Sequence, residues 1–302
     1  MRVIVVGFGS IGSRHARILA QEHDVHVISR RDISDFPRSN TIAEGLIAHC
    51  PEYIVIATAT DEHFADLAEL ARLGYSESLL IEKPVFAKFE ILPEMRTRRL
   101  AVGYNLRFHP LVRRLKTLVE QDVALVSADF YVGQHIEDWR PGRAYQSSYS
   151  ARVERGGGVI RDLSHELDLA RYLIGDFTLL TATEGRRELL QVDPPHEVVV
   201  VGASSECRQL RISLNCIDRP AQRWIRIQSQ TSTYHADLLT GELVGPNFHE
   251  SLICDRNDTY RLMHQNVLSE TGAEFASMAD GLSVMKLISE IEQHMRSVRL
   301  ST

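Results

Sequence analysis

The feature that most constrains the fold is a glycine-rich turn that starts at the seventh residue. An apolar run over residues 3–6 predicts a strand, and it leads directly into the sequence GFGSIG and then into a helical pattern. Gly7 permits a tight turn out of the strand, Gly9 lets the backbone approach a pyrophosphate, and Gly12 lets the helix pack closely on the strand. The N–H groups and the positive dipole end of that helix then face the phosphates. The pattern predicts a dinucleotide site lined by Gly7, Phe8, Gly9, Ser10, Ile11 and Gly12.

A hydroxyl and two guanidinium groups follow the second predicted strand. This strand covers residues 25–28, and Ser29, Arg30 and Arg31 come directly after it, with no carboxylate before Asp32. NAD sites place an acidic residue here to bind the ribose hydroxyls, whereas an arginine accommodates the 2′-phosphate of NADP. The residues favour NADP(H), with NAD as the other option. The alternative is that the arginines only cap a surface loop, since arginine is mostly exposed in proteins.

The composition is that of an ordinary globular protein and excludes several classes of partner. The chain has 302 residues, of which 44% are hydrophobic and 25% charged, enough for two domains. Its 34 basic and 40 acidic residues give a net charge of -6, which argues against binding to nucleic acid or an anionic membrane. The four cysteines form no CxxC pair, so no metal is expected. Without a leader pattern or a membrane-length apolar run, we expect a cytoplasmic protein.

Residues 1–121 are predicted to form a first domain built on a doubly wound parallel sheet. Short apolar runs alternate there with helical segments, the pattern of a sheet covered by helices. The expected strands cover residues 2–6, 25–29, 53–57, 79–81 and 99–103. The expected helices cover residues 10–21, 42–49, 61–73 and 108–121. The short, proline-containing stretch after residue 84 is expected to be a loop.

Residues 122–302 are predicted to form a second α/β domain with a large, mostly antiparallel sheet. Five strand-like stretches follow one another with short polar connections, which predicts a meander. They cover residues 178–183, 197–203, 208–216, 223–229 and 232–239. Sheets of this kind often leave one face free of helices, so the open face is expected to serve for self-association as a dimer or tetramer.

Three further motifs are expected at the carboxyl ends of the parallel strands, where ligands bind in such sheets. The third strand ends at Ala57 and is followed by Thr58, Ala59 and, a turn later, His63; Thr60 there is equally well a helix N-cap. The fourth strand is followed by Glu82 and Lys83 before a proline, and a lysine so placed can act as a general acid or base. The fifth strand is followed by the sequence GYNLRFHP.

The longest motif is GGGVIRDLSHELD at residues 156–168. Three glycines precede a predicted helix, on which Asp162, His165 and Glu166 are expected to share one face. A carboxylate beside a histidine can orient the ring for proton transfer. The segment offers too few ligands for a metal site. The alternative is a structural contact between a histidine and an aspartate on a half-buried helix.

Together these motifs resemble the Gfo/Idh/MocA family of NAD(P)-dependent oxidoreductases over nearly the whole chain. The similar segments are GFGSIGSRH, IATATDEH, EKP, GYNLRFHP, WRP and GGGVIRDLSHELD. The resemblance implies a Rossmann domain followed by an α/β domain, with the active site in the cleft between them. It implies that Lys83 lies near the nicotinamide and the reacting carbon, and that Asp162 and His165 are the substrate-binding and acid/base pair. The remaining residues that it assigns to the cofactor or substrate are Glu82, Asn105, Arg107, Trp139, Arg140 and, more weakly, Tyr260.

Two departures from the family pattern matter. Members commonly place the histidine four residues after the aspartate, whereas here His165 is three after Asp162 and Glu166 takes the fourth place. The proton donor could therefore be His165, Glu166 or Lys83. The short segment between Pro84 and Val102 also leaves no room for the usual helix.

The expected reaction is reversible hydride transfer between a nicotinamide and a carbinol carbon of a sugar, cyclitol or related polyol. In this hypothesis Lys83 exchanges a proton with the substrate oxygen, while His165 and Asp162 assist and bind hydroxyls. The alternative is a cofactor-binding regulator of the same fold that has lost catalysis. A third possibility is a different Rossmann reductase, which would keep the cofactor but not the EKP and GGG motifs.

Overall fold

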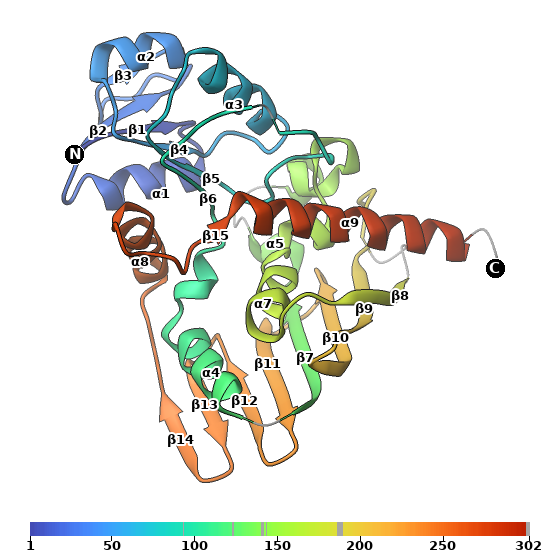
Figure 1. Ribbon diagram of the computed structural model, residues 1–302. Coiled ribbons are helices and arrows are strands. Elements are labelled where there is room, and N and C mark those ends of the chain that lie inside the picture. The colour runs from blue at the N-terminus through green and yellow to red at the C-terminus, as the bar shows by residue number, and fades with distance from the viewer. Residues whose placement is uncertain (93, 123, 140–141, 143, 186–189, 300–302) are drawn as a thin grey trace. The chain divides into compact units, whose positions relative to one another are not determined.

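The protein divides into two compact units. The computed structural model describes residues 1–92, 94–122, 124–139, 142, 144–185 and 190–299 (Figure 1). Backbone contacts assign Met1–Asn105 and Arg256–Leu282 to unit 1, and Leu106–Asp255 and Ser283–Thr302 to unit 2. This division differs from the predicted boundary after residue 121. The helix at residues 110–121 contacts strands of the second sheet and so belongs to unit 2, and residues 256–282 return to unit 1 after that sheet has formed.

Unit 1 contains a seven-stranded sheet in the order β15-β6-β5-β4-β1-β2-β3. All neighbouring strands are parallel except β15 and β6. Every residue of β4 and β5 is buried, as expected for parallel strands covered on both faces. The strands are β1 (Arg2–Val6), β2 (Asp24–Ile28), β3 (Arg38–Ser39), β4 (Tyr53–Ile56), β5 (Ser78–Ile81), β6 (Arg99–Val102) and β15 (Ala276–Ser277).

Two pairs of helices cover this sheet. Helix α1 (Ser10–Leu19) contacts α8 (Arg256–Leu268), and α2 (Ile42–His49) contacts α3 (His63–Arg72). In Figure 1 the two pairs lie on opposite faces of the sheet. Helix α8 also contacts β5, and β15 extends the sheet at β6, so the returning segment belongs to unit 1.

The predicted elements of unit 1 agree with the structure. Each of the five expected strands and three expected helices is present, with bounds that differ by at most two residues. In the described part of the stretch between β5 and β6 there is no helix, so the expected loop is confirmed. The returning segment, α8 and β15, was not predicted.

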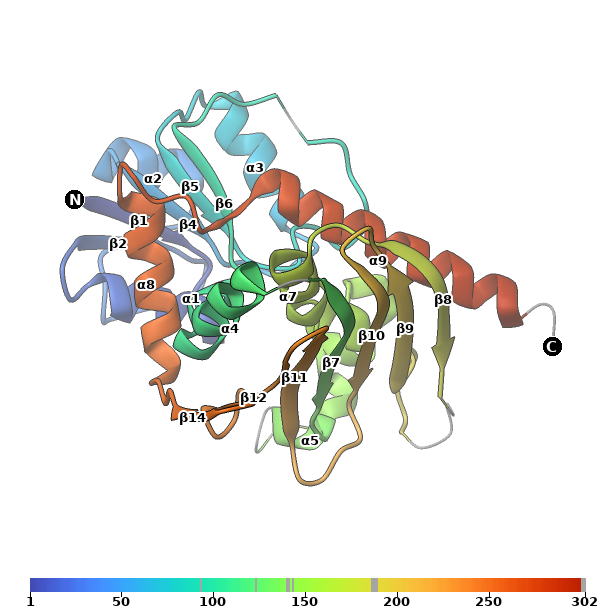
Figure 2. The same cartoon turned by 60° about the horizontal axis from the view of Figure 1, so that its bottom comes forward.

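Unit 2 contains an eight-stranded sheet in the order β14-β13-β12-β11-β7-β10-β9-β8. Figure 2 shows β11, β7, β10, β9 and β8 side by side. All pairs are antiparallel except β10 and β7. The strands are β7 (Leu125–Gly133), β8 (Thr178–Glu184), β9 (Glu197–Ala203), β10 (Cys207–Asn215), β11 (Gln222–Ser229), β12 (Thr233–Asp237), β13 (Glu242–Gly245) and β14 (Phe248–Ser251).

The predicted meander is wrong at one point. The five expected strands are present, but β10 and β11 are not neighbours, because β7 is inserted between them and pairs with both. Strand β7 has the alternation of a half-buried strand, with Ala128, Phe130 and Val132 buried between more exposed residues. The same alternation of apolar and polar residues can be read in the sequence, so this strand could have been predicted. The predicted class, a parallel sheet and a large, mostly antiparallel one, is confirmed.

Helices contact one face of the second sheet. Helix α4 contacts β12 and β13, α6 contacts β9 and β10, and α7 contacts β7 and β10. In β9 buried and partly exposed residues alternate, so the opposite face is more accessible in this chain. Its use for self-association stays a prediction. The helices are α4 (Pro110–Gln121), α5 (Ile136–Trp139), α6 (Val159–Asp162), α7 (His165–Ile174) and α9 (Met278–Arg299), with short 3-10 turns at Asn105–Phe108, Tyr145–Ser147, Tyr149–Ala151 and Val153–Arg155. The first turn and α9 each begin in unit 1 and continue in unit 2.

Within the described ranges, no helix combines the length and the apolar character that crossing a bilayer requires.

Candidate functional site

The three glycines of the first turn have the distinct environments that a dinucleotide site needs. Gly7 has a φ of +91°, and a Cβ there would lie 2.6 Å from the carbonyl oxygen of Ala57. A Cβ on Gly12 would lie 2.0 Å from the carbonyl oxygen of Gly7, so the helix packs against the turn itself. Gly9 is different, because a Cβ there would meet no atom within 4 Å. The backbone at Gly9 therefore faces open space, where a phosphate can approach.

The N-terminus of α1 is suited to an anion. Gly9 is its N-cap residue and has no side chain to cap the first N–H groups, and the first turn carries no acidic residue. The positive end of the helix dipole and these N–H groups are therefore available for a negatively charged ligand. Phe8 packs edge-on against Phe36, with ring centroids 5.8 Å apart. The predicted residues thus fit the pyrophosphate of a dinucleotide.

The residues after β2 form a basic turn. Ser29 is buried, and its Oγ accepts a hydrogen bond from the backbone N–H of Arg31 at 3.1 Å. The side chain of Arg30 is 85% exposed and pairs with Glu62 at 2.8 Å. The sequence analysis did not include Arg38. This residue of β3 lies opposite Val27 of β2 and pairs with Asp32 at 3.2 Å. Its place next to β2 follows from the β2–β3 pairing, which no local motif indicated.

The segment from the end of β4 into α3 carries a partly buried carboxylate and a buried histidine that contacts a neighbouring loop. Thr58 donates a hydrogen bond from Oγ1 to Asp66 at 2.5 Å, and burial raises the pKa of Asp66 to about 6. His63 is buried at the start of α3. Its Nδ1 lies 3.2 Å from the carbonyl oxygen of Pro84 and 3.1 Å from that of Val85, so it donates to the loop that follows Lys83. Burial lowers the pKa of His63.

Glu82 and Lys83 directly follow β5. Lys83 is partly exposed, and its backbone N–H donates to Oε2 of Glu82 at 3.1 Å. Glu82 is buried, with Oε1 2.9 Å from Nε2 of His15 on α1. A Cβ on Gly103 would lie 2.7 Å from Oε1 of Glu82, so the glycine after β6 leaves room for this carboxylate. Lys83 therefore extends from a backbone position that is held on both sides, by Glu82 and by His63.

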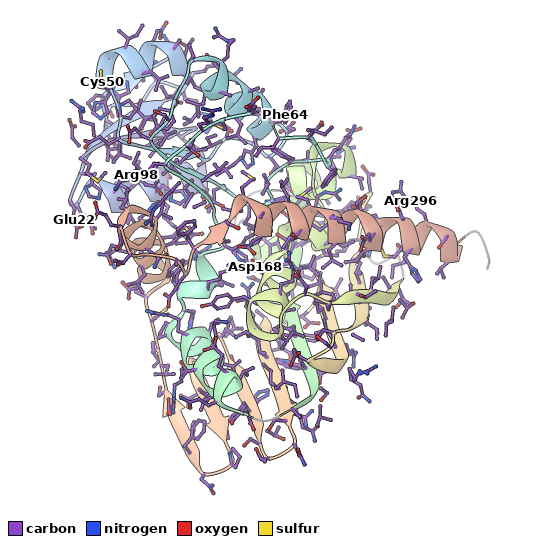
Figure 3. The ribbon with its side chains drawn as sticks, in the orientation of Figure 1. Glu22, Cys50, Phe64, Arg98, Asp168 and Arg296 are labelled. Carbon is purple, nitrogen blue, oxygen red and sulfur yellow. The ribbon has the colours of Figure 1, made fainter. Side chains whose placement is uncertain are left out.

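Two residues assigned by resemblance are buried and have partners within their own units. In unit 1, Asn105 donates from Nδ2 to Oγ1 of Thr259 at 2.7 Å. In unit 2, Arg107 donates from Nε to Oδ2 of Asp168 at 2.9 Å and from a terminal nitrogen to Oδ1 at 2.5 Å. Figure 3 labels Asp168 on α7. The roles of Asn105 and Arg107 toward a cofactor or substrate stay predictions.

The glycines at 156–158 introduce a helix that is shorter than expected. Gly156 and Gly158 have φ angles of +76° and +115°, which only glycine adopts readily. Asp162 accepts a hydrogen bond from the N–H of Gly158 at 3.2 Å, and α6 ends at Asp162. His165 begins a new helix, α7. The prediction that Asp162 and His165 share one face of a single helix is wrong, because the chain turns at residues 163–164.

The carboxylate of Glu166 is engaged by an arginine. Glu166 is buried, and Nε of Arg223 donates to its Oε1 at 2.7 Å. Asp162 and His165 are both partly exposed. Burial and the nearby charge of Arg223 lower the pKa of His109 to about 4, so this ring is neutral at physiological pH. Its Nδ1 accepts a hydrogen bond from the N–H of Leu111. The ion pair with Arg223 stabilises the charged form of Glu166, which weighs against this residue as the proton donor.

The remaining predicted residues are placed as follows. Trp139 lies on α5 and donates from Nε1 to the carbonyl oxygen of Gln134 at 3.0 Å. Arg140 lies outside the described residues. Tyr260 is buried on α8, edge-on to His15 with ring centroids 5.3 Å apart. Across the described ranges no three His, Cys, Asp or Glu side chains are grouped so that they could hold a metal ion.

Within unit 1 the sheet brings the predicted cofactor residues together. Strands β1, β4, β5 and β6 are neighbours, and all four run in the same direction. The glycine turn, Thr58, Lys83 and Asn105 therefore all lie at one edge of the sheet. Asp162, His165 and Glu166 belong to unit 2.

Comparison with known proteins identifies similar dehydrogenases. No protein-family model matches the chain. The levoglucosan dehydrogenase of Pseudarthrobacter phenanthrenivorans is 25% identical over 143 residues, which cover 44% of this chain and 36% of that protein. The sequence match therefore spans about a third of the length of that relative.

Solved structures match over nearly the whole chain. A levoglucosan dehydrogenase in complex with NADH has a TM-score of 0.81 at 16% identity, covering 97% of both chains. The WlbA dehydrogenase from Bordetella pertussis, in complex with NADH and UDP-GlcNAcA, has a TM-score of 0.77 at 18% identity, covering 98% of this chain and 97% of that one. The UDP-N-acetylglucosamine 3-dehydrogenase GnnA from Acidithiobacillus ferrooxidans has a TM-score of 0.77 at 19% identity, covering 98% of both. At these identities the likeness shows the fold.

Proposed function

We propose that the protein is an NAD(P)-dependent oxidoreductase of the Gfo/Idh/MocA family that acts on a CH–OH group of a sugar, cyclitol or sugar derivative. The observation that carries this proposal is the common sheet edge of unit 1, where the open backbone at Gly9 and the held Lys83 follow neighbouring parallel strands. Ligands bind at the carboxyl edge of such sheets. Solved neighbours of the same fold carry NADH together with levoglucosan or UDP-GlcNAcA, which supports a sugar as substrate.

The N–H groups of α1 and the turn at Gly9 would hold the pyrophosphate of the dinucleotide, and the residues after β2 its adenosine ribose. The nicotinamide, when bound, supplies hydride exchange with a carbon of the substrate. Lys83 moves the accompanying proton at its Nζ and, when charged, stabilises negative charge on the substrate oxygen. Asp162 and His165 bind substrate hydroxyls, and His165 assists the proton transfer.

Replacement of Lys83 by Met tests the catalytic role. The variant Lys83→Met keeps a side chain of similar length but removes the proton carrier, so we expect turnover to fall roughly 100- to 10,000-fold. Dinucleotide affinity should persist, because the glycine turn is untouched. Turnover is followed by the absorbance of the reduced nicotinamide, with a panel of aldoses, inositols and their keto forms. The matched control is Lys88→Met, which changes an exposed lysine on the loop that follows.

The outcomes separate the alternatives. Unchanged turnover in Lys83→Met would reject the role of this lysine. Tight dinucleotide binding by the wild type without turnover on any member of the panel would instead support a regulatory protein that has lost catalysis.

We further propose a preference for NADP(H). It is supported by Ser29, by the guanidinium groups of Arg30 and Arg31, and by the absence of an acidic residue directly after β2. A hydrogen bond to a charged group contributes about 1.5–3 kcal/mol, so Arg31→Ala should weaken NADPH binding roughly 10- to 100-fold and leave NADH binding nearly unchanged. The control is Arg72→Ala, an exposed arginine in the last turn of α3. Equal affinity of the wild type for NADPH and NADH would refute the preference.

A further inference from the structure

Four buried side chains of unit 1, Glu82, His15, His264 and Tyr53, form a continuous line of hydrogen bonds that ends next to Lys83. Nε2 of His15 lies 2.9 Å from Oε1 of Glu82, and Nδ1 of His15 lies 2.8 Å from Nε2 of His264. Nδ1 of His264 lies 2.8 Å from the hydroxyl of Tyr53. His15 and Tyr53 are fully buried, His264 is 3% exposed and Glu82 is 7% exposed. The four side chains come from α1, β4, α8 and the residue after β5, segments that lie far apart in the sequence.

The geometry allows one arrangement of protons in which each group has a partner. Tyr53 is fully buried, and among the described residues its hydroxyl has one hydrogen-bond partner, Nδ1 of His264. If Tyr53 donates there, His264 must carry its proton on Nε2 and donate to Nδ1 of His15. His15 then carries its own proton on Nε2 and donates to Glu82. All three hydrogen bonds point toward the carboxylate.

The opposite arrangement is unfavourable. If the line ran the other way, with a doubly protonated His15 or a protonated Glu82, His264 would accept at Nε2 and donate at Nδ1. The hydroxyl hydrogen of Tyr53 would then need an acceptor other than His264. Burial raises the pKa of Tyr53 well above its usual value, so the phenol keeps its proton. Burial, with His15 and His23 nearby, lowers the pKa of His264 well below its usual value, so this ring stays neutral. The titratable and charged groups that face the line are Arg14, His23, His63, Tyr75 and Tyr260.

This directed line acts on the backbone of Lys83. A buried carboxylate is stable only where donors satisfy it, and His15 supplies the donor at Oε1. The other oxygen, Oε2, accepts from the N–H of Lys83 at 3.1 Å. Gly103 bounds the carboxylate on one side, since a Cβ there would come within 2.7 Å of it. Fixing Glu82 therefore fixes the point from which the Lys83 side chain extends.

We propose that His15, His264 and Tyr53 are positioning residues, which form a one-way chain of hydrogen-bond donors that holds Glu82 as a carboxylate and thereby places Lys83 for proton transfer. The effect on turnover rests on the proposed function, whereas the chain of donors and its hold on Lys83 do not. Helix α8 takes part because His264 completes the link between His15 and Tyr53. The returning segment of the chain thus supplies the imidazole of His264, which connects two side chains of the first 105 residues.

The first experiment reads the protons directly, without turnover. Heteronuclear NMR of the imidazole nitrogens distinguishes the two neutral tautomers of histidine from the doubly protonated ring. Signals are assigned by their loss in His15→Gln and His264→Gln. At about pH 8 we expect the proton of each neutral ring to lie on Nε2, the atom from which the chain of donors requires it to donate. A proton on Nδ1 of either neutral ring, or a doubly protonated His15 at about pH 8, would overturn the proposal.

The second experiment follows the consequence at Lys83. His264→Phe keeps an aromatic ring but removes both hydrogen bonds, whereas His264→Gln retains one donor and one acceptor. We expect the amide proton of Lys83 to exchange faster with solvent in His264→Phe, and to regain protection in His264→Gln. The control is His26→Phe, which removes a buried histidine of β2 that bonds Ser39 outside the line.

Kinetics separate positioning from mere stability. At a temperature where His264→Phe is fully folded, we expect kcat to fall roughly 10- to 100-fold, with dinucleotide affinity within about twofold of the wild type. His264→Gln should recover most of the loss. A variant that unfolds at lower temperature, yet keeps the wild-type kcat and the wild-type exchange at Lys83, would show that the line is only structural. If the wild type itself turns over no substrate, the proposed function fails, and the NMR and exchange results still decide on the chain.

Discussion

The ion pair between Arg107 and Asp168 allows a test of what Arg107 does. The family resemblance predicts that its loss weakens substrate binding, whereas the structure predicts that its loss destabilises the fold. The resemblance assigns Arg107 to the substrate. In unit 2, however, the guanidinium donates to both oxygens of Asp168, and the two side chains are 7% and 1% exposed. The same guanidinium lies over the ring of Tyr172, 4.9 Å from its centroid. The perturbation is Arg107→Met, which keeps most of the apolar stem and removes the charge.

The expected magnitude follows from the burial of the partner. Arg107→Met would remove the guanidinium that pairs with the buried carboxylate of Asp168, and breaking a buried pair in this way costs about 3–5 kcal/mol. At roughly 2–4 °C per kcal/mol for a protein of this size class, the unfolding midpoint should fall by roughly 6–20 °C. The double variant Arg107→Met/Asp168→Leu replaces the pair by apolar side chains. It should regain most of this loss, since such replacements are often neutral or stabilising.

Tryptophan fluorescence is a suitable assay. The chain has two tryptophans, Trp139 and Trp224, and both belong to unit 2. Trp224 is stacked on Tyr131, with ring centroids 5.1 Å apart, so its emission should change when the sheet unfolds. Thermal and denaturant unfolding of the wild type, both single variants and the double variant complete a double-mutant cycle. The reasoning is refuted if Arg107→Met unfolds at the wild-type midpoint and instead raises KM for the substrate.

Two further predictions concern unit 1. Gly12→Ala should destabilise it by about 1–3 kcal/mol or more, because the new Cβ meets the Gly7 carbonyl. Gly9→Ala should cost less than about 1 kcal/mol of stability and mainly weaken dinucleotide binding. Calorimetric unfolding and a binding titration check both variants, and equal losses of stability would contradict these roles. Burial raises the pKa of Asp66 to about 6, so the folded state keeps a proton that the unfolded state loses near pH 4. The protonated carboxyl therefore contributes about 3 kcal/mol to the free energy of unfolding below pH 4, and this contribution is lost as the pH rises through about 6. Asp66→Asn, which can still accept from Thr58, should therefore gain stability relative to the wild type between about pH 5 and pH 8, and a difference that does not change with pH would count against it.

Local sequence patterns were sufficient for much of unit 1. Continuous apolar runs marked β4 and β5, because strands of a parallel sheet are buried on both faces. The glycines at 7, 9 and 12 could be assigned separate roles, since each role depends on the backbone of the turn itself. The position of Lys83 at the sheet edge followed from the strand before it.

Patterns were insufficient where a segment's neighbours lie far away in the sequence. The alternation in β7 indicated a strand, but not that it would separate β10 from β11. The spacing of Asp162 and His165 fits one helix, yet the chain turns between them. The Arg107–Asp168 pair joins residues 61 positions apart, and no motif near either one indicates it.

By itself the sequence determined the class of fold, the glycine turn for a dinucleotide, and the charged residues that follow each parallel strand, because periodicity and turn chemistry act over a few neighbouring residues. Only the tertiary structure decided that α8 returns to unit 1 and brings His264 within hydrogen-bond distance of His15, a residue 249 positions away. Such a contact is fixed by the burial of one face of α8 in unit 1, where the helix contacts α1 and β5. Its energy comes from packing that no local stretch of the chain contains.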